Sequence, residues 1–112
     1  MNTAVKKHLF EILRFIEELE VVIGESDSFE HFSKDAKAIR AAERLYEIIG
    51  EATRKALEKQ PDLPISDSKK IIALRNILAH NYDNVAAKIL WETASGGVPV
   101  LKKEVGLLLK LE

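Results

Sequence analysis

Cysteine is absent from the 112-residue sequence, which excludes disulfide bonds, thiol nucleophiles and zinc sites built on thiolates. A reducing, cytoplasmic environment is therefore the expected one. Long apolar runs are also missing, so the sequence predicts neither a signal peptide nor a membrane-spanning helix. Its 17 basic side chains nearly balance 18 acidic ones, and the net charge of −1 provides no global field that attracts nucleic acid. Any contact with RNA must therefore be local.

Proline, glycine and aromatic residues are scarce, and aromatics make up only 6% of the chain. Leucine, isoleucine, alanine, glutamate and lysine dominate instead, and this composition favours helices over strands. A hydrophobic fraction of 46% is enough to furnish one core in a chain of this length. The sequence therefore predicts a single all-α domain that spans residues 1–112.

Apolar residues recur at three- and four-residue spacing along most of the chain, as amphipathic helices require. The spacing predicts long helices, short linkers and one proline stop at Pro61. Short links between helices make antiparallel packing the default, so we expect an antiparallel four-helix bundle with an additional short helix. Whether a further short helix forms at 29–34 after a Ser28 cap is left open. The expected helices cover residues 5–24, 35–60, a stretch that follows caps at Ser66 and Asp67 and ends near His80, 85–91 and 99–111.

Two glycine features interrupt this pattern. Gly50 lies inside the second long helix, where glycine costs about 1 kcal/mol relative to alanine. Its presence predicts that a neighbouring helix approaches closely at this point. Ser95-Gly-Gly97 predicts a flexible turn, and because no lysine-serine pair follows, it is not a phosphate-binding loop.

The most informative stretch is Arg75-Asn-Ile-Leu-Ala-His80-Asn-Tyr82, which combines a fixed cation, a titratable imidazole and a phenol. Arg75 and His80 are five residues apart and would diverge by about 140° on a regular helix. They converge only if the helix ends near His80 or if a second subunit completes the cleft. Asn76 and His80 are four residues apart, so the Asn76 amide can orient the imidazole. The same residues also fit a structural role at a helix C-terminus, so both readings stay open.

Other candidate residues carry weaker signals. Glu51 could orient Arg75 across the bundle, although an exposed, solvated glutamate is the commoner outcome. His8 and His31 are expected at the surface, and without a Glu-x-x-His pair no metal site or cofactor is predicted. Trp91 is expected to pack in the core. Three lysines that flank the motif are ordinary surface residues or guides for an RNA backbone: Lys69, Lys70 and Lys88.

Arg75, His80 and Tyr82, with the polar Asn76, resemble the R-x4-H-x-Y signature of HEPN domains, in particular the HepT-like toxins. The segments Ile49-Gly-Glu-Ala52 and 85–91 resemble two further parts of that family, so the likeness covers most of the chain. One departure is visible, because the family often has a tryptophan shortly before the arginine helix. Asp67-Ser68 stands at that place here, and the difference bears on local packing or on the rim of the cleft.

The resemblance implies a metal-independent endoribonuclease toxin of a toxin–antitoxin system, which acts as a homodimer with two motifs facing one cleft. His80 would serve as acid and base and Arg75 as the phosphate stabiliser, in a reaction that cuts RNA and spares DNA. An imidazole, with an ordinary pKa of about 6.5, suits proton transfer near neutrality.

The resemblance also implies a partner, a minimal nucleotidyltransferase that acts as antitoxin and transfers AMP to Tyr82. An anionic nucleotide on Tyr82 would occupy the phosphate site and compete for Arg75. Two other readings remain: a non-catalytic module that binds a nucleotide or acts as an adaptor for the nucleotidyltransferase, and a purely structural dimer.

Overall fold

The computed structural model describes residues 1–66, 69–74 and 84–110. Every regular element in these ranges is helical, which confirms the all-α class. None of the described helices is both long enough and apolar enough to cross a membrane. The labelled elements are α1 (Thr3–Gly24), α2 (Phe29–Ser33), α3 (Ala36–Lys59), α5 (Asn84–Ser95) and α6 (Gly97–Lys110).

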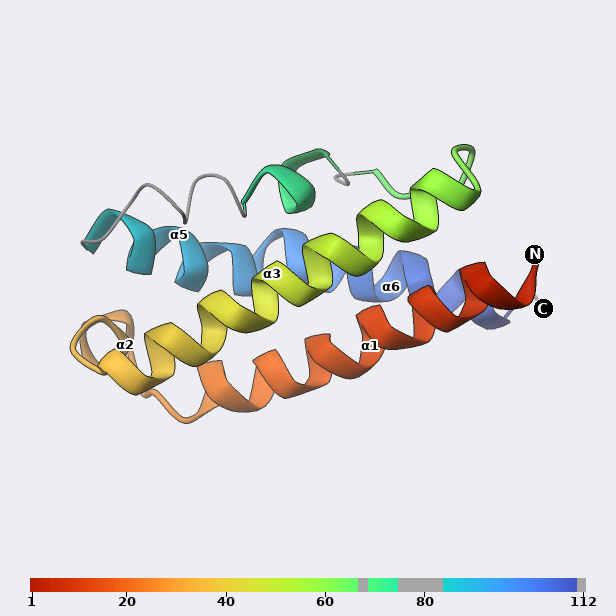
Figure 1. The fold of residues 1–112 in the computed structure, drawn as a ribbon. Coiled ribbons are helices and arrows are strands. Elements are labelled where there is room, and N and C mark those ends of the chain that lie inside the picture. The colour runs from red at the N-terminus through yellow and green to blue at the C-terminus, as the bar shows by residue number, and fades with distance from the viewer. Residues whose placement is uncertain (67–68, 75–83, 111–112) are drawn as a thin grey trace.

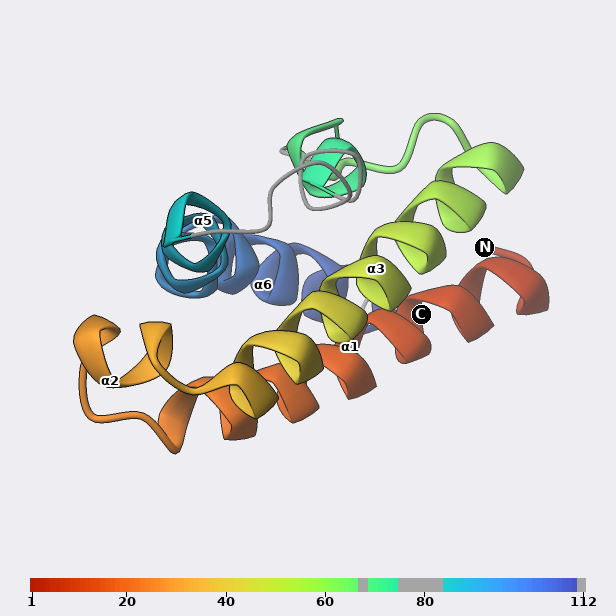
Figure 2. The same ribbon diagram turned by 60° about the vertical axis from the view of Figure 1, so that its left-hand side comes forward.

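The long helices α1 and α3 form an antiparallel pair along one side of the molecule (Figure 1). α5 and α6 follow one another along the other side, while the short α2 lies beside α5 at one end (Figures 1 and 2). Residues 69–74, which are helical, lie along α3 on the side away from α1 (Figure 2). The expected four-helix bundle depends on the helix predicted to carry the motif, and residues 75–83 of that prediction lie outside the described residues.

Helix starts are fixed by side chains that satisfy free backbone N–H groups. Asn2, Ser28 and Asp35 each accept a hydrogen bond from the N–H three residues later, at 2.9, 3.1 and 3.0 Å. The cap at Ser28 resolves the open question about the short helix, because α2 begins directly after it. α3 ends just before Pro61, as the sequence predicts.

The core forms where the apolar stripes of α1 and α3 meet, with further side chains from α5 and α6. A fully buried aliphatic side chain contributes about 1.5–3 kcal/mol, so the α1 stripe alone is a large part of the stabilising burial. The half-buried Trp91 packs its ring against Phe32 and Phe29, at centroid distances of 5.3 and 6.4 Å. This contact confirms the core role expected for Trp91 and fastens α2 to α5. The buried α1 stripe is Val5, Leu9, Ile12, Ile16 and Leu19.

The expectation of a flexible turn at residues 95–97 is wrong. α5 continues to Ser95 and α6 begins at Gly97, so Gly96 alone separates the two helices. Its N–H donates to the carbonyls of Glu92 and Thr93, at 3.0 and 3.2 Å, which closes the last turn of α5. α6 therefore starts two residues earlier than expected, and Pro99 falls in its first turn, where a missing N–H costs nothing.

Candidate functional site

Four of the five residues expected at the site, Arg75, Asn76, His80 and Tyr82, lie outside the described residues. Glu51 lies on α3 and is described. The described parts of the chain show what holds the residues immediately before and after the motif.

Residues 69–74, the last described residues before Arg75, are helical. The side chains of Ile71 and Leu74 are buried in the core, each 3% exposed. A Cβ atom on Gly50 would lie 3.3 Å from the Ile71 carbonyl oxygen and 3.8 Å from the Cα of Ile72. The close approach expected at Gly50 is therefore confirmed, and the helix that packs there is the one that leads into the motif.

A second contact holds the linker that precedes this segment. The Ser66 N–H donates to both carboxylate oxygens of Glu104 on α6, at 3.3 and 3.1 Å, and the Ser66 hydroxyl donates to one of them at 3.1 Å. Leu63 and Ile65 on the same linker are buried. The chain before the motif is therefore attached to α6 as well as to α3.

After the motif, the next described element is α5, which begins at Asn84, two residues after Tyr82. The Tyr46 hydroxyl on α3 donates to the Leu90 carbonyl on α5 at 2.7 Å, inside the core. Burial raises the pKa of the Tyr46 phenol well above its ordinary value, so the group stays a neutral donor. Together with the Trp91 contacts, this bond fixes α5 against α3 and α2.

Glu51 is half-buried rather than freely solvated. Its two carboxylate oxygens accept hydrogen bonds from Arg54, from Nη2 at 2.6 Å and from Nε at 3.3 Å. The hydrogen bond to Glu51 raises the pKa of Arg54 above its ordinary value. That Glu51 orients Arg75 stays a prediction. The carboxylate borders a groove of about 350 Å³ that is lined by Glu11, Arg44, Glu47, Ile48, Glu51, Ala52 and Lys55.

Arg54 was not singled out from the sequence. Its ion pairs could have been predicted from the spacing, because Glu51, Arg54 and Glu58 are three and four residues apart on one helix. Arg54 pairs with both glutamates.

The two histidines outside the motif behave differently. The surface position expected for His8 is wrong, since its side chain is only 13% exposed and Nδ1 lies 3.2 Å from Glu11 Oε1. The reason is its place beside Leu9, on the flank of the buried α1 stripe. His31 is exposed, as expected. Over the ranges that the structure describes, no three histidine, aspartate or glutamate side chains come together in a way that could hold a metal ion.

The chain matches the family model "Ribonuclease HepT-like" over residues 11–108. It is 30% identical over 110 residues to a protein of Methanocaldococcus jannaschii that is provisionally named as an RNase, covering 95% of this chain and 88% of that one. A provisionally named RNase of Caldanaerobacter subterraneus is 39% identical over 89 residues, covering 76% and 77% of the two chains.

A third relative, from Thermococcus cleftensis, is named as a probable ribonuclease HepT. It is 32% identical over 114 residues, which cover 98% of this chain and 100% of that one. No solved structure matches the chain. Because the family model extends over the two long helices, the motif and the C-terminal helices alike, the chain belongs to the HepT-like ribonuclease family, as its R-x4-H-x-Y motif predicts.

Proposed function

We propose that this protein is a metal-independent endoribonuclease and acts as the toxin of a toxin–antitoxin pair. The observation that carries the proposal is the match to the HepT-like family over residues 11–108 together with an intact Arg75, His80 and Tyr82. The relatives named as ribonucleases support the same reaction class. The helix that contains the motif would complete the four-helix bundle between its attachment at Gly50 and the start of α5.

In the proposed reaction, neutral His80 takes the proton from a ribose 2′-hydroxyl. The resulting 2′-oxygen attacks the adjacent phosphorus and the bond from phosphorus to the 5′-oxygen breaks. A 2′,3′-cyclic phosphate forms on one fragment, and the 5′-oxygen of the other takes up a proton, for which His80 of a second subunit is the proposed donor. Arg75 neutralises the charge that develops on the phosphoryl oxygens, and its planar guanidinium can bind two of them at once.

Asn76 is the proposed partner that fixes the tautomer of His80, and Glu51 is the proposed second-layer residue that orients Arg75. A homodimer would bring two motifs to one cleft and supply both the base and the acid. A cognate minimal nucleotidyltransferase would silence the site by transferring AMP to Tyr82, since the added phosphate competes for Arg75.

The test is incubation of purified protein with total RNA in the presence of a chelator. We expect products that end in a cyclic phosphate, and we expect both His80→Ala and Arg75→Ala to lower the cleavage rate by at least about 100-fold, the scale of losing one acid–base or charge-stabilising group. A matched control is His8→Gln, which changes a histidine on α1. A DNA oligonucleotide of the same sequence should stay intact, because it lacks the attacking hydroxyl.

Undiminished cleavage by the His80→Ala protein would show that another group performs the chemistry. If the RNA stays intact while the protein binds ATP or the nucleotidyltransferase, the result favours the alternative function, a non-catalytic adaptor module. Growth arrest on expression of the protein alone, lost in the same two variants, would tie the activity to toxicity.

A further inference from the structure

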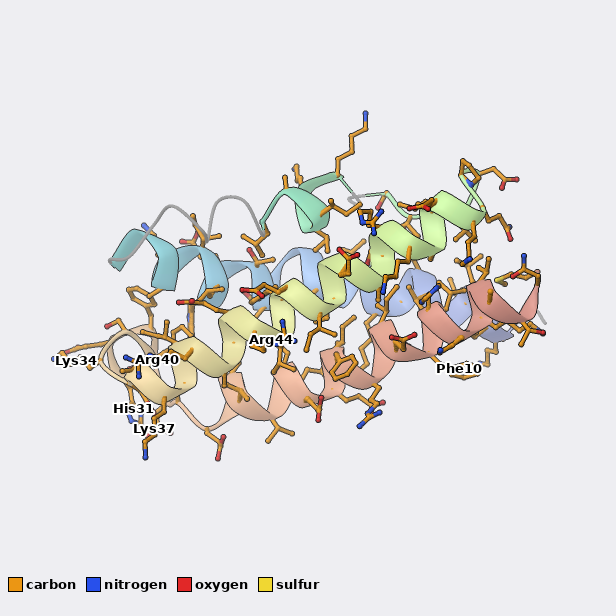
Figure 3. The ribbon with its side chains drawn as sticks, viewed as in Figure 1. Phe10, His31, Lys34, Lys37, Arg40 and Arg44 are labelled. Carbon is orange, nitrogen blue, oxygen red and sulfur yellow. The ribbon has the colours of Figure 1, made fainter. Side chains whose placement is uncertain are left out.

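Four exposed basic side chains gather at the end of the molecule where α2 and the start of α3 lie (Figure 3). We name this set the basic cluster; it consists of His31, Lys34, Lys37 and Arg40. His31 and Lys34 come from α2 and its C-cap, while Lys37 and Arg40 come from the first turns of α3. Arg44 extends the same row along α3, where it forms an exposed ion pair with Glu47 at 3.3 Å. A chain of net charge −1 thus presents the cations of Lys34, Lys37 and Arg40 together at one end.

Carboxylates close to the basic cluster neutralise little of it. The Asp35 carboxylate accepts a hydrogen bond from the Ala38 N–H as the cap of α3 and is held there. Glu30 forms an ion pair with Lys34 at 3.2 Å, but both side chains are more than 70% exposed, so water screens the pair. Within the described ranges, Lys37 and Arg40 form no ion pair with an acidic side chain. Their charges therefore remain available to an external anion.

The spacing of the row suits a chain of anions better than a single one. Residues 37, 40 and 44 are three and four apart, so their side chains share one face of α3. At a rise of about 1.5 Å per residue they extend over about 10 Å, and successive phosphates of one nucleic-acid strand advance by about 3.4 Å. The row is therefore about as long as three steps of such a strand, which span four phosphates. Long lysine and arginine side chains contact such a backbone without reading its sequence.

The basic cluster also lies at the end of the molecule where α5 begins (Figure 1). α5 begins two residues after Tyr82, and its first turns lie at the same end as α2 and the start of α3 (Figures 1 and 2). The rings of Phe29, Phe32 and Trp91 hold α2 against α5, so the cluster keeps a fixed position relative to that end of α5. A strand bound along the cluster would therefore lie at the same end of the molecule as the start of α5, two residues after Tyr82 (Figure 3).

We propose that the basic cluster binds the sugar–phosphate backbone of the RNA strand beside the bond that is cleaved. The inference rests on the proposed ribonuclease function and adds a second, sequence-independent contact to it. The favoured ligand is RNA rather than an acidic protein, because a row of long cationic side chains along one helix face supplies repeated charge to a phosphate backbone.

The experiment measures binding of the full-length protein to a short fluorescent single-stranded RNA whose 2′-hydroxyls are all methylated, so that it cannot be cut. The cluster variant combines Lys34→Gln, Lys37→Gln and Arg40→Gln. A control variant with the same net charge changes three cations outside the cluster: Lys7→Gln, Lys103→Gln and Lys110→Gln. Fluorescence anisotropy gives the dissociation constant across a series of salt concentrations, and thermal unfolding followed by circular dichroism verifies that each variant is folded.

We expect the cluster variant to bind at least about 10-fold more weakly than the wild type at low salt, and the control variant to bind like the wild type. Each lost phosphate contact reduces the slope of log affinity against log salt by about 0.7, so the slope should become shallower by up to about 2. Equal affinities and equal slopes for the cluster and control variants would overturn the proposal. So would a cluster variant that binds RNA normally but no longer binds an acidic protein partner.

Cleavage of unmodified RNA by the wild-type protein separates this inference from the proposed function. If the wild-type protein cleaves RNA but the cluster variant binds methylated RNA as tightly as the wild type, the proposed RNA contact at the cluster is wrong and the proposed ribonuclease function stands. If RNA binding depends on the cluster but the wild-type protein cleaves no RNA, the cluster is supported as an RNA contact and the proposed ribonuclease function is wrong. A wild-type protein that neither binds nor cuts RNA overturns both.

Discussion

Replacing Gly50 by leucine tests whether the position of the motif depends on the close contact between α3 and residues 69–74. Even a Cβ atom at this place would lie 3.3 Å from the Ile71 carbonyl oxygen, and that oxygen belongs to the backbone and cannot turn aside. The further atoms of leucine would have to push the whole segment away from α3. Arg75 follows directly, so the displacement would carry the motif with it.

The magnitude follows from two opposing effects. Replacing glycine inside a helix gains up to about 1 kcal/mol of helix propensity. Overpacking a filled contact costs about 1–3 kcal/mol, and displacement of the segment would also expose part of Ile71 and Leu74. We therefore expect Gly50→Leu to lower the free energy of unfolding by about 1–2 kcal/mol, a drop of at least about 4–8 °C in Tm for a domain of this size. Because misplacement by about 1 Å can cost about 100-fold in rate, RNA cleavage should fall far more than stability does.

Gly106 provides the matched control. It lies inside α6, and a Cβ atom there would meet nothing within 4 Å. Gly106→Ala should therefore gain about 0.5–1 kcal/mol, whereas Gly50→Ala should gain less or lose stability. Thermal unfolding and RNA cleavage would be measured on all three variants. The reasoning would be refuted if Gly50→Leu were as stable and as active as the wild type, or if the two alanine variants gained equal stability.

Two further changes test the other anchors of the motif segment. Tyr46→Phe removes the buried 2.7 Å hydrogen bond to the Leu90 carbonyl and should cost about 1 kcal/mol in urea denaturation; no loss would mean that the bond contributes nothing net. Burial raises the pKa of Tyr46 in the folded state. The stability that the neutral phenol contributes is therefore fully present below the pKa of the unfolded state, about 10, and is lost as the pH rises further. Above that pH the phenylalanine variant should lose less stability than the wild type. Glu104→Gln weakens an exposed contact with Ser66 and should cost under about 1 kcal/mol while RNA cleavage falls several-fold; unchanged cleavage would show that this linker does not position the motif.

Much of the fold could be predicted from the sequence because the signals are local. Apolar periodicity and a proline stop give α1 and α3 nearly to the residue, and Gly50 marks the close helix contact. The near-continuity of α5 and α6 could not be predicted in this way. A Gly-Gly pair is typical of a turn, but the Gly96 N–H reaches back into α5 and the following glycine already belongs to α6.

For the candidate site, too, local spacing predicts some features and not others. Spacing identifies Arg75, Asn76, His80 and Tyr82 as a set, but whether they converge depends on the path of the chain between residues 74 and 84 and on a second subunit. The periodicity of the sequence predicts neither the path of the chain nor the position of a second subunit. Contacts between distant parts of the chain, such as Ser66 with Glu104 or Tyr46 with Leu90, also leave no mark in local spacing, although they fix the ends of that path.

The arrangement separates holding the motif in place from holding the substrate. The chain before Arg75 is attached through backbone packing at Gly50 and through Glu104, and the chain after Tyr82 through Tyr46 and the aromatic contacts of Trp91. None of these contacts depends on the exposed cations of the basic cluster. On this reasoning, a change in an anchor lowers the rate at saturating RNA, whereas a change in the cluster raises KM and alters its salt dependence. On the two proposals together, a nearly neutral protein acts on RNA because the cations of the basic cluster bind the strand, while the core positions the groups that react.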